Sequence, residues 1–471
     1  MPRKIKIVAT ISSLNSSPKF IKGLYRAGMN VVRLNTAHMT HEDALHVIKN
    51  TRQISDKIGI LLDTKGPEIR TCDTDKSLAV KYGDIVRIKG APLEKSKGKV
   101  ICVSYKDFVR DVPVGSSIMI DDGFIALAVM DKDDKYLRCH VENDGVINAR
   151  KSINIPSVHV KLPALSEKDI GFIEFAVDND LDFIAHSFVR NKDDVLTVQK
   201  ILDRKKSSIK IIAKIENARG VENLSEILDH AYGIMIARGD LAVEIPTEQI
   251  PLIQKQIIRT CIEKRKPVIV ATQMLHSMIE SPRPTRAEVS DVANACLDHA
   301  DALMLSGETA NGKYPEMAVR TMAKIAREVE DKTSSYMNAP YTLENKITAY
   351  LAKSAVKASL RLNTKAIVAD SLTGESIRAL AAYRGDNPIY AQVYDKRVMR
   401  QLSLSFGVFA DYISMDITSQ DSLNKSICRL IDDKQFKRED LIIVLAGHFG
   451  IKQGASYIEI STAENFKKKC N

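Results

Sequence analysis

Polar and charged residues end most of the short apolar runs in this sequence, and their types suit the chemistry of anions. Seven of eight such runs, all rich in Val, Ile or Leu, finish on these groups. The groups are Arg33 with Asn35, Asp63 with Lys65, Ser187 with Arg190, Lys214 with Glu216, Arg238 with Asp240, Thr272, and Ser306 with Glu308. A single Lys or Glu after a strand is usually a solvated loop residue, but seven coincidences favour one shared site.

The mixture of acids and cations indicates a metal ion and an anionic substrate. Mg²⁺ prefers one or two carboxylates together with substrate oxygens and water, and Glu216 and Asp240 are the natural candidates. Arg33 and Lys214 can neutralise a phosphoryl group during transfer. These residues predict metal-assisted chemistry on a phosphorylated or enolate-forming anion, and they leave a kinase, an aldolase and a lyase all open.

Other metal and nucleotide motifs do not appear. The chain has no GxxxxGK[ST] loop and no His and Cys set with zinc spacing. His38, His41 and His46 are close in sequence, and we interpret them as helix-start and surface residues rather than ligands.

Eight repeats of an apolar run and a helix-length stretch predict a (β/α)₈ TIM barrel, a fold of about 250 residues. We expect residues 1–65 and 160–335 to form it. The strand candidates are residues 5–10, 30–35, 59–64, 182–187, 210–215, 233–238, 267–272 and 302–307. Active sites of such barrels lie at the carboxyl ends of the strands, so the polar groups should share one rim.

Two other parts of the chain lie outside the predicted barrel and have their own sequence patterns. Residues 66–159 contain short alternating strands separated by Gly, Asp and Lys turns, which predicts a small β-barrel lid domain inserted in one βα loop. From 340 to 471, apolar runs again alternate with helices, which predicts an open α/β domain at the C-terminal end. The predicted fold class is therefore α/β with three domains.

Composition narrows the possible partners. Lys and Arg (69) exceed Asp and Glu (59) without forming a tail, and there is no Trp, which argues against nucleic acid and is compatible with small anions. Seven cysteines without a C-x-x-C pair argue against a disulfide framework. No run reaches the roughly 20 apolar residues of a membrane span, and the opening MPRKIKIVATI is too charged for a signal peptide. We expect a cytoplasmic protein with no membrane partner.

Long motifs in these same stretches closely resemble the pyruvate kinase family. They include GMNVVRLNTAH (28–38), LLDTKGPEIRT (61–71), IIAKIEN (211–217), GIMIARGDLAVEIP (233–246), VIVATQMLHSMIESPRPTRAEVSDVANA (268–295) and DALMLSGETANGKYP (301–315). The likeness is nearly continuous through residues 1–330. It implies a barrel with a β lid and a C-terminal α/β domain, and the glycolytic reaction of phosphoenolpyruvate with ADP to give pyruvate and ATP.

The resemblance also implies roles for single residues. Arg33 would hold the transferring phosphoryl group and Lys214 would stabilise its transition state. Glu216 and Asp240 would bind Mg²⁺ or Mn²⁺. The backbone of Gly239 and Asp240, with the hydroxyl of Thr272, would hold the substrate carboxylate.

Nucleotide phosphates would be bound by Arg70, Lys151, His38 and the backbone from Asn35 to His38. Lys151 lies in ARKSIN, where the family often has a glycine-containing sequence. Asp122 and Gly123 would lie on the closing face of the lid, although a plain β-turn explains them equally well.

A K⁺ site is where the residues and the resemblance disagree. Its ligands would be Asn35, Asp63 and the carbonyl of Thr64, with a Ser hydroxyl at the position that is Ala37 here. Glu68 is typical of K⁺-dependent members, and a lone acid would need a compensating charge. We therefore expect a weakened K⁺ site with water or Thr36 in place of the lost hydroxyl. The first strand is followed by TISSLN, where the family usually has Gly-Pro.

Three further expectations concern the proton, the effector and assembly. The enolate would gain its proton from Thr272 or from a water chain near Ser306 and Glu308. The turn from Ser371 to Ser376 could bind a phosphorylated effector or could simply cap a helix. Residues 282–295 resemble the segment that meets a neighbouring subunit, which implies a homotetramer.

Two rival functions are kept. One is a metal-dependent lyase that acts through the pyruvate enolate, against which Arg70, Lys151 and the lid argue. The other is a catalytically inactive sensor of phosphoenolpyruvate or a sugar phosphate, against which the intact set Lys214, Glu216, Asp240 and Thr272 argues.

Overall fold

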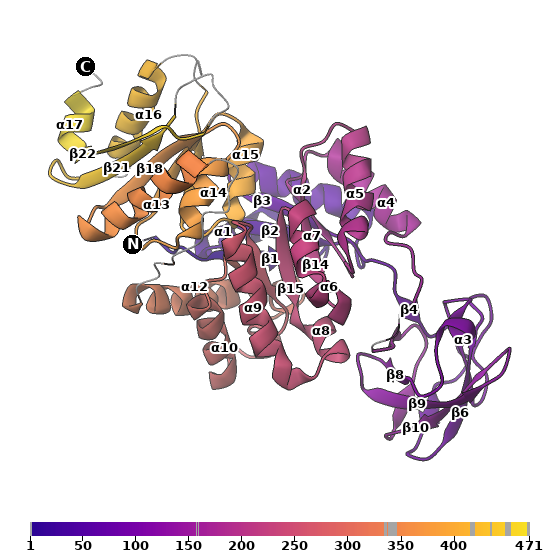
Figure 1. Cartoon of the computed structure of the whole chain (residues 1–471). Coiled ribbons are helices and arrows are strands. Elements are labelled where there is room, and N and C mark those ends of the chain that lie inside the picture. Colours follow the sequence, from indigo (N-terminus) through magenta and orange to yellow (C-terminus); the bar gives the residue numbers. More distant parts are fainter. Residues whose placement is uncertain are drawn as a thin grey trace.

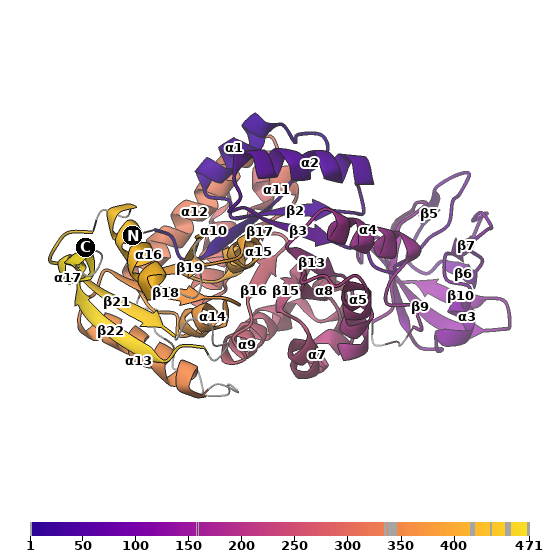
Figure 2. The same ribbon diagram turned by 90° about the horizontal axis from the view of Figure 1, so that it is seen from above.

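The chain forms three units in a row, with a barrel between a C-terminal α/β unit and a β lid (Figures 1 and 2). The structure is a computed structural model. It describes residues 2–156, 158, 160–333, 337, 346–414, 420–433, 436–447 and 454–468. None of the helices within these ranges is long and apolar enough to cross a membrane.

Eight parallel strands close the central barrel in the order β1-β17-β16-β15-β14-β13-β3-β2, which confirms the predicted fold. The strands are β1 (Lys6–Thr10), β2 (Val31–Asn35), β3 (Gly59–Asp63), β13 (Phe183–His186), β14 (Lys210–Ile215), β15 (Gly233–Ala237), β16 (Val268–Ala271) and β17 (Ala302–Leu305). Almost every residue in them is buried, because one face packs inside the barrel and the other packs against helices.

Helices surround the barrel strands. They are α1 (Pro18–Ala27), α2 (His41–Ile54), α4 (Glu167–Asp178), α5 (Lys192–Arg204), α6 (Ala218–Glu222), α7 (Leu224–His230), α8 (Arg238–Glu244), α9 (Ile250–Glu263), α10 (Arg286–Leu297), α11 (Gly307–Ala310) and α12 (Pro315–Lys332). Three of them, α2, α4 and α10, begin with a capping box, in which a Thr or Ser hydroxyl accepts from the backbone three residues on.

Strand alternation decides which side chains reach the barrel interior. On β13, Phe183 and Ala185 belong to the inner core, whereas Ile184 packs in the outer layer beneath the helices. The same alternation places Ser187 at the inner rim and His186 in the outer layer. A shift of one residue would exchange them.

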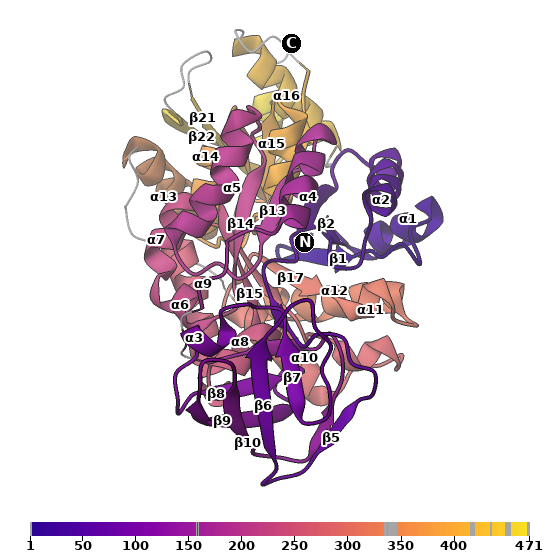
Figure 3. The same cartoon turned by 90° about the vertical axis from the view of Figure 1, so that its right-hand side faces the viewer.

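The lid is inserted between β3 and α4 and stands beyond the carboxyl ends of the barrel strands (Figures 1 and 3). Its sheet has the order β4-β12-β8-β9-β10-β6-β7. Its elements are β4 (Ile69–Arg70), β5 (Leu78–Val80), β6 (Ile85–Gly90), β7 (Val100–Val103), α3 (Phe108–Asp111), β8 (Ser117–Ile120), β9 (Ile125–Lys132), β10 (Leu137–Val141), β11 (Gly145–Ile147) and β12 (Ser152–Asn154). A bridge between Thr71 and Val103 joins the two edges, so the sheet curls into a small barrel around its own core.

The C-terminal unit is a five-stranded sheet of order β20-β19-β18-β21-β22, in which only β22 is antiparallel to its neighbour. Its elements are α13 (Lys346–Arg361), β18 (Ala366–Ser371), α14 (Glu375–Ala382), β19 (Ile389–Val393), α15 (Lys396–Gln401), β20 (Val408–Tyr412), α16 (Gln420–Asp433), β21 (Leu441–Ala446), β22 (Tyr457–Thr462) and α17 (Ala463–Lys468). This is the open α/β sheet expected from the sequence.

Buried ion pairs join this unit to the amino end of the barrel. Arg384 contacts Asp301, just before β17, at 2.6 Å, and Arg400 contacts Asp182, just before β13, at 2.5 Å. Charges this deeply buried are tolerated because each is paired. The C-terminal unit therefore covers the end of the barrel opposite the polar rim.

Five cysteines of the described chain are free thiols: Cys72, Cys102, Cys139, Cys261 and Cys296. Cys428 in α16 is disulfide-bonded.

Candidate active site

Four charged side chains from β2, β3 and the end of β14 meet at the carboxyl rim of the barrel. Arg33 at the end of β2 donates from Nε to Oδ2 of Asp63 at 2.6 Å. Lys214 of β14 lies between Asp63 Oδ1 at 3.1 Å and Glu216 Oε1 at 2.9 Å. All four are buried. Burial alone would raise the pKa of Asp63, but Lys214 and Arg33 outweigh it and hold that pKa below its usual range.

Lys214 is held as a cation. Burial alone lowers the pKa of an ammonium, yet the carboxylates of Asp63 and Glu216 raise the pKa of Lys214 overall. The Lys214 ammonium therefore stays positively charged at the rim, between the carboxylates of Asp63 and Glu216.

Ser187, just after β13, is the third partner of the Lys214 ammonium. Its hydroxyl accepts from Lys214 Nζ at 2.8 Å and donates to the carbonyl of Thr64 at 2.6 Å. The sequence placed Ser187 on the rim but gave it no role in the site. The contact could have been predicted from the sequence. Side chains alternate between the two faces of β13, and this alternation directs Ser187 into the barrel, toward Lys214 of β14.

Glu216 and Asp240 lie on adjacent strand ends and form the candidate metal site. Burial raises the pKa of Glu216 to about 7, and Asp240 adds to this while Lys214 opposes it. Burial, followed by the carboxylates of Asp122 and Glu68, raises the pKa of Asp240. The raised pKa values show that two carboxylates are unfavourable so close together in this buried place. A divalent cation bound between them would supply the positive charge that favours their ionised forms.

No group of three or more His, Cys, Asp or Glu residues within the described ranges is arranged to hold a metal by itself. A site with two carboxylates is nevertheless what Mg²⁺ uses when substrate oxygens and water complete its shell. The donor set therefore fits the ion expected from the sequence.

Thr272 after β16 adopts an unusual backbone conformation, with φ of 68°. A β-branched residue is strained there, and such strain is concentrated at functional sites. Its Oγ1 accepts from the backbone N–H of Gly239 at 2.8 Å, and its carbonyl accepts from Arg238 at 2.8 Å. Arg238 is itself held by Asp291 at 2.7 Å. Thr272 and Gly239 thus share one corner of the rim.

The predicted nucleotide residues of the lid lie close together: Arg70 ends β4, and Lys151 directly precedes β12, the strand that pairs with β4. Arg70 Nη2 contacts Glu68 at 2.6 Å, and Lys151 Nζ contacts Asp121 at 2.9 Å. Ser152 pairs with Arg70 in the ladder. Within the described chain, no hydrogen bond or ion pair connects the side chain of Arg70 or Lys151 to the barrel rim.

The K⁺ ligands implied by resemblance lie together, but their oxygens already have partners. Asn35 Oδ1 accepts from the backbone of Ala37 at 3.2 Å, and the carbonyl of Thr64 accepts from Ser187. The hydroxyl of Thr36 is fully buried and donates to the carbonyl of Asp63 at 2.9 Å.

Glu68 has a cationic partner in this structure. Its carboxylate is neutralised by Arg70, two residues away on the same face of an extended segment. Arg70 thus compensates Glu68 for as long as this ion pair is kept.

Glu308 is a structural residue here. It is buried, and its two carboxylate oxygens accept from the backbone N–H groups of Leu275 and Ser306 at 3.1 and 2.8 Å. A carboxylate held by two amides shapes the loop after β17, and any water chain at this point would run past Ser306.

The histidines near the second strand have structural surroundings, as the sequence suggests. His41 stacks on Phe175 with ring centroids 4.9 Å apart, and His46 contacts the amide of Asn50 at 3.0 Å. His38 is exposed beside the rim, where its backbone N–H donates to the carbonyl of Asn35 at 3.2 Å.

The possible effector turn precedes α14. Gly374 has φ of 77°, and its N–H donates to Ser371 Oγ at 2.9 Å, while the N–H of Glu375 contacts Thr373 Oγ1 at 3.4 Å. The hydroxyls therefore satisfy the amides of this turn in the manner of a helix start.

Comparison with known proteins identifies relatives of the whole chain. The family model described as "Pyruvate kinase, barrel domain" matches residues 2–319, and the model "Pyruvate kinase, alpha/beta domain" matches residues 350–461. A pyruvate kinase of Borreliella burgdorferi is 45% identical over 99% of this chain and 98% of its own length. One from Staphylococcus haemolyticus is 42% identical over 94% of this chain and 78% of its own length. The crystal structure of a pyruvate kinase from Cryptosporidium parvum superimposes with a TM-score of 0.91 at 35% identity, covering 98% of this chain and 96% of that one.

Proposed function

The chain belongs to the pyruvate kinase family, and on this premise we propose that its rim transfers the phosphoryl group of phosphoenolpyruvate to ADP, giving pyruvate and ATP. The observation that carries the proposal is the buried network of Arg33, Asp63, Lys214 and Glu216. The comparisons support neither of the two rivals, the lyase and the inactive sensor.

Arg33 and Lys214 provide the positive charge for the phosphoryl group. Both are fixed by Asp63, so their ammonium and guanidinium groups need little reorganisation when a substrate arrives. Phosphoryl transfer depends on alignment and charge stabilisation more than on covalent steps by the protein. Two anions that repel each other can therefore approach in line beside these cations.

Glu216 and Asp240 would hold Mg²⁺ or Mn²⁺, which supplies positive charge for substrate oxygens. The carboxylates are set by their surroundings, since Glu216 Oε2 accepts from the backbone N–H of Phe188 at 2.6 Å. This bond aims the other oxygen toward Lys214 and the rim.

The substrate carboxylate would lie at the corner formed by Gly239, Asp240 and Thr272. Backbone N–H groups at the start of α8 point toward this corner and favour an anion. The hydroxyl of Thr272 now accepts from Gly239, and a bound carboxylate would take over that N–H as well as the hydroxyl.

Arg70, Lys151, His38 and the backbone from Asn35 would bind the nucleotide phosphates. The acidic partners of the two lid cations, Glu68 and Asp121, must then give way to the phosphates. Closure of the lid would bring these cations to the rim and exclude water, which otherwise hydrolyses the phosphoryl donor.

A K⁺ ion beside Asn35, Asp63 and Thr64 remains part of the proposal in a weakened form. The side chain of Ala37 contributes no oxygen, so water or Thr36 would complete the shell. Ser187, whose hydroxyl lies 3.4 Å from Asp63 Oδ1, is a protein oxygen close to this point.

Protonation of the enolate is assigned to Thr272 or to water near Ser306, because Glu308 is occupied by two backbone amides. A homotetramer, a cytoplasmic location and an effector at Ser371 to Ser376 are further expectations from the family resemblance.

A coupled assay for pyruvate tests the proposal directly. Pyruvate should appear only when phosphoenolpyruvate, ADP and Mg²⁺ are all present. Pyruvate formation that is independent of ADP would favour the lyase, and tight binding without any turnover would favour the sensor.

A further inference from the structure

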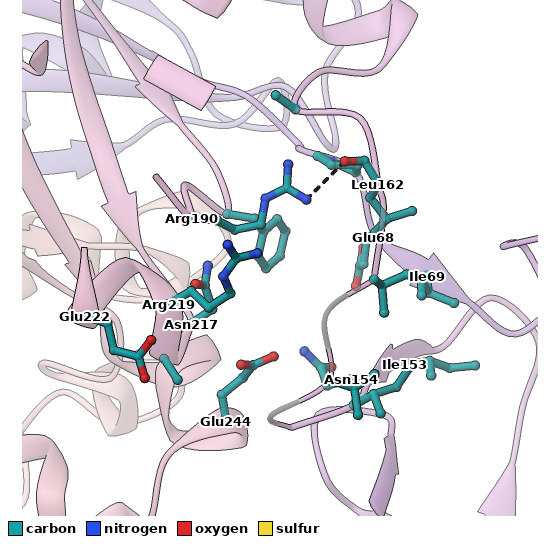
Figure 4. Close-up of a pocket in the computed structure, with 17 residues that line it drawn as sticks. Glu68, Ile69, Ile153, Asn154, Leu162, Arg190, Asn217, Arg219, Glu222 and Glu244 are labelled. Carbon is teal, nitrogen blue, oxygen red and sulfur yellow. Dashed lines mark hydrogen bonds between the residues drawn. The ribbon is translucent and has the colours of Figure 1, made fainter. Parts of the chain in front are cut away.

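A cavity of about 380 Å³ lies where the lid joins the barrel, and we call it the hinge pocket. One wall is made by the two chain segments that enter and leave the lid, through residues 67–69 and residues 153–155, 158, 160, 162 and 164. The other wall is made by residues that follow β13, β14 and β15 (Figure 4). Its volume is in the range of small-molecule sites, about 300–1,000 Å³. Arg33, Asp63 and Lys214 do not line it, so it is separate from the catalytic rim.

The lid wall is apolar. Ile69, Ile153 and Ile155 are buried residues of the lid, and Val160 and Leu162 extend this surface along the returning segment. Phe188 closes the pocket from the barrel side. A ligand would therefore need a hydrocarbon or aromatic body.

The barrel wall is acidic once its ion pairs are considered. Arg190 is neutralised by two contacts to Asp194, at 2.9 and 3.0 Å, and also donates to the carbonyl of Leu162. Glu68 is likewise neutralised by Arg70. The other charged residues that line the pocket are Glu222, Glu244 and Arg219.

Glu244 and Glu222 carry more negative charge than Arg219 can balance. Among described residues, neither carboxylate forms an ion pair. Glu244 is largely withdrawn from solvent and accepts from the backbone of Ala218. Figure 4 shows Glu244 and the lid residue Asn154 directed into the same space from opposite walls. Charge complementarity thus favours a cation.

The hinge pocket lies next to the catalytic site on both the lid side and the barrel side. Ile69 of β4 pairs with Ile153 of β12. Arg70 is the next residue of β4, and it pairs with Ser152. On the barrel side, the backbone of Phe188 donates to Glu216, and Asn217 is the next residue along the chain. A ligand here would touch the hinge of the lid without entering the catalytic rim.

We propose that the hinge pocket binds an amphipathic cation, a primary amine with an apolar body, and that the bound ligand opposes closure of the lid. The ammonium lies between Glu244 and Glu222, and the apolar body packs on the wall of Ile69, Ile153 and Val160. A ligand favours the conformation that it binds, so it holds the entering and leaving segments at their present separation. The effect on nucleotide binding rests on the proposed nucleotide site of Arg70 and Lys151, whereas binding itself does not.

Calorimetric titration of the full chain without substrates tests the binding. The probe is 4-phenylbutylamine, with 4-phenylbutanol and 4-phenylbutyrate as matched neutral and anionic probes. The amine should bind at least tenfold more tightly than either of the others. Glu244→Gln should weaken the amine about tenfold, and Ala164→Phe, which fills the pocket, should abolish binding. Val114→Phe, which places the same aromatic ring on the exposed surface of the lid, should leave binding unchanged.

Kinetics test the consequence. In the wild type, the amine should raise KM for ADP at least threefold and leave KM for phosphoenolpyruvate unchanged, and it should have no effect on Ala164→Phe. The inference is overturned if no probe binds, if the butyrate binds as tightly as the amine, or if both pocket variants bind the amine normally. Normal amine binding by a chain that forms no pyruvate would instead contradict only the proposed function.

Discussion

The barrel rim and the lid present cations of very different character. The side chain of Lys214 is 11% exposed and has two carboxylates and a hydroxyl around it. Lys151 and Arg70 on the lid are 37% and 38% exposed, and the ammonium of Lys151 pairs with one acid. The rim is therefore organised before substrate arrives, whereas the lid must exchange acidic partners for phosphates.

This difference suits the two substrates. Fixed charges in a dry site stabilise a transition state without paying for reorganisation at that moment. Exposed pairs cost little to open, since such pairs contribute only about 0–1 kcal/mol. A nucleotide can then bind and leave on a moving lid while the chemical site stays intact.

Removing the central cation should break the rim most severely. Lys214→Met is expected to lower kcat by about 10³-fold, because the phosphoryl group loses a preorganised charge in a site that excludes water. Steady-state pyruvate formation measures this. Lys210→Met, at the other end of β14, is the matched control and should keep kcat within twofold. A folded Lys214→Met enzyme with near-normal kcat would contradict the role of the rim.

Removing a lid cation should affect nucleotide binding alone. Lys151→Ala is expected to raise KM for ADP about tenfold, which corresponds to about 1.4 kcal/mol, and to leave KM for phosphoenolpyruvate unchanged. The adjacent Arg150→Ala is the control, since Arg150 is highly exposed and pairs with Asp73. Equal effects of the two substitutions would mean that only the general charge of the lid matters.

Acid should weaken the metal site of the rim. The pKa of Glu216, raised to about 7 in the metal-free protein, means that protons compete with Mg²⁺ below neutral pH. The affinity should fall by up to about tenfold per pH unit below 7. The same shift affects the stability of the metal-free protein. Between about pH 4.5 and 7, the Glu216 carboxyl is ionised in the unfolded chain but still protonated in the fold, so the free energy of unfolding falls as the pH rises.

Calorimetric titration of Mg²⁺ at pH 8, 7 and 6 measures this effect. Asp240→Asn removes both a proposed Mg²⁺ ligand and a neighbouring charge that raises the pKa of Glu216. The affinity should therefore fall at every pH, and the onset of proton competition should move to lower pH. An affinity that does not change between pH 8 and 6 would show that Glu216 is ionised throughout.

Restoring one oxygen should have the smallest effect. Ala37→Ser is expected to lower the K⁺ concentration for half-maximal activity about three- to tenfold, the value of roughly one added polar contact. Ala37→Cys has a similar size but a soft sulfur and should bring no gain. If wild-type activity does not respond to K⁺ and Ala37→Ser does not change that, the chain has no K⁺ site.

The fold was accessible from sequence because its signals are local. Apolar runs of strand length, helix-length stretches between them and the change of texture at residue 66 each report on their own segment. The positions of Arg33, Lys214, Glu216 and Asp240 on one rim then follow from the barrel itself.

Pairing between segments was less accessible. Nothing in the local pattern shows that Asp63 contacts both Arg33 and Lys214, or that both oxygens of Glu308 are used by backbone amides. The strained φ of Thr272 also depends on packing around β16. By contrast, Glu68 and Arg70 are two residues apart in an extended segment, and their contact could have been anticipated from strand periodicity.

Binding of phosphoenolpyruvate in the absence of nucleotide is the most direct test of the difference between rim and lid. Calorimetry with Mg²⁺ would compare the wild type with the double variant Arg70→Ala, Lys151→Ala. If the rim is organised independently of the lid, the two proteins should have Kd values within twofold of each other. A Kd at least tenfold weaker in the double variant would show that the lid cations help to build the phosphoenolpyruvate site, and would contradict this account.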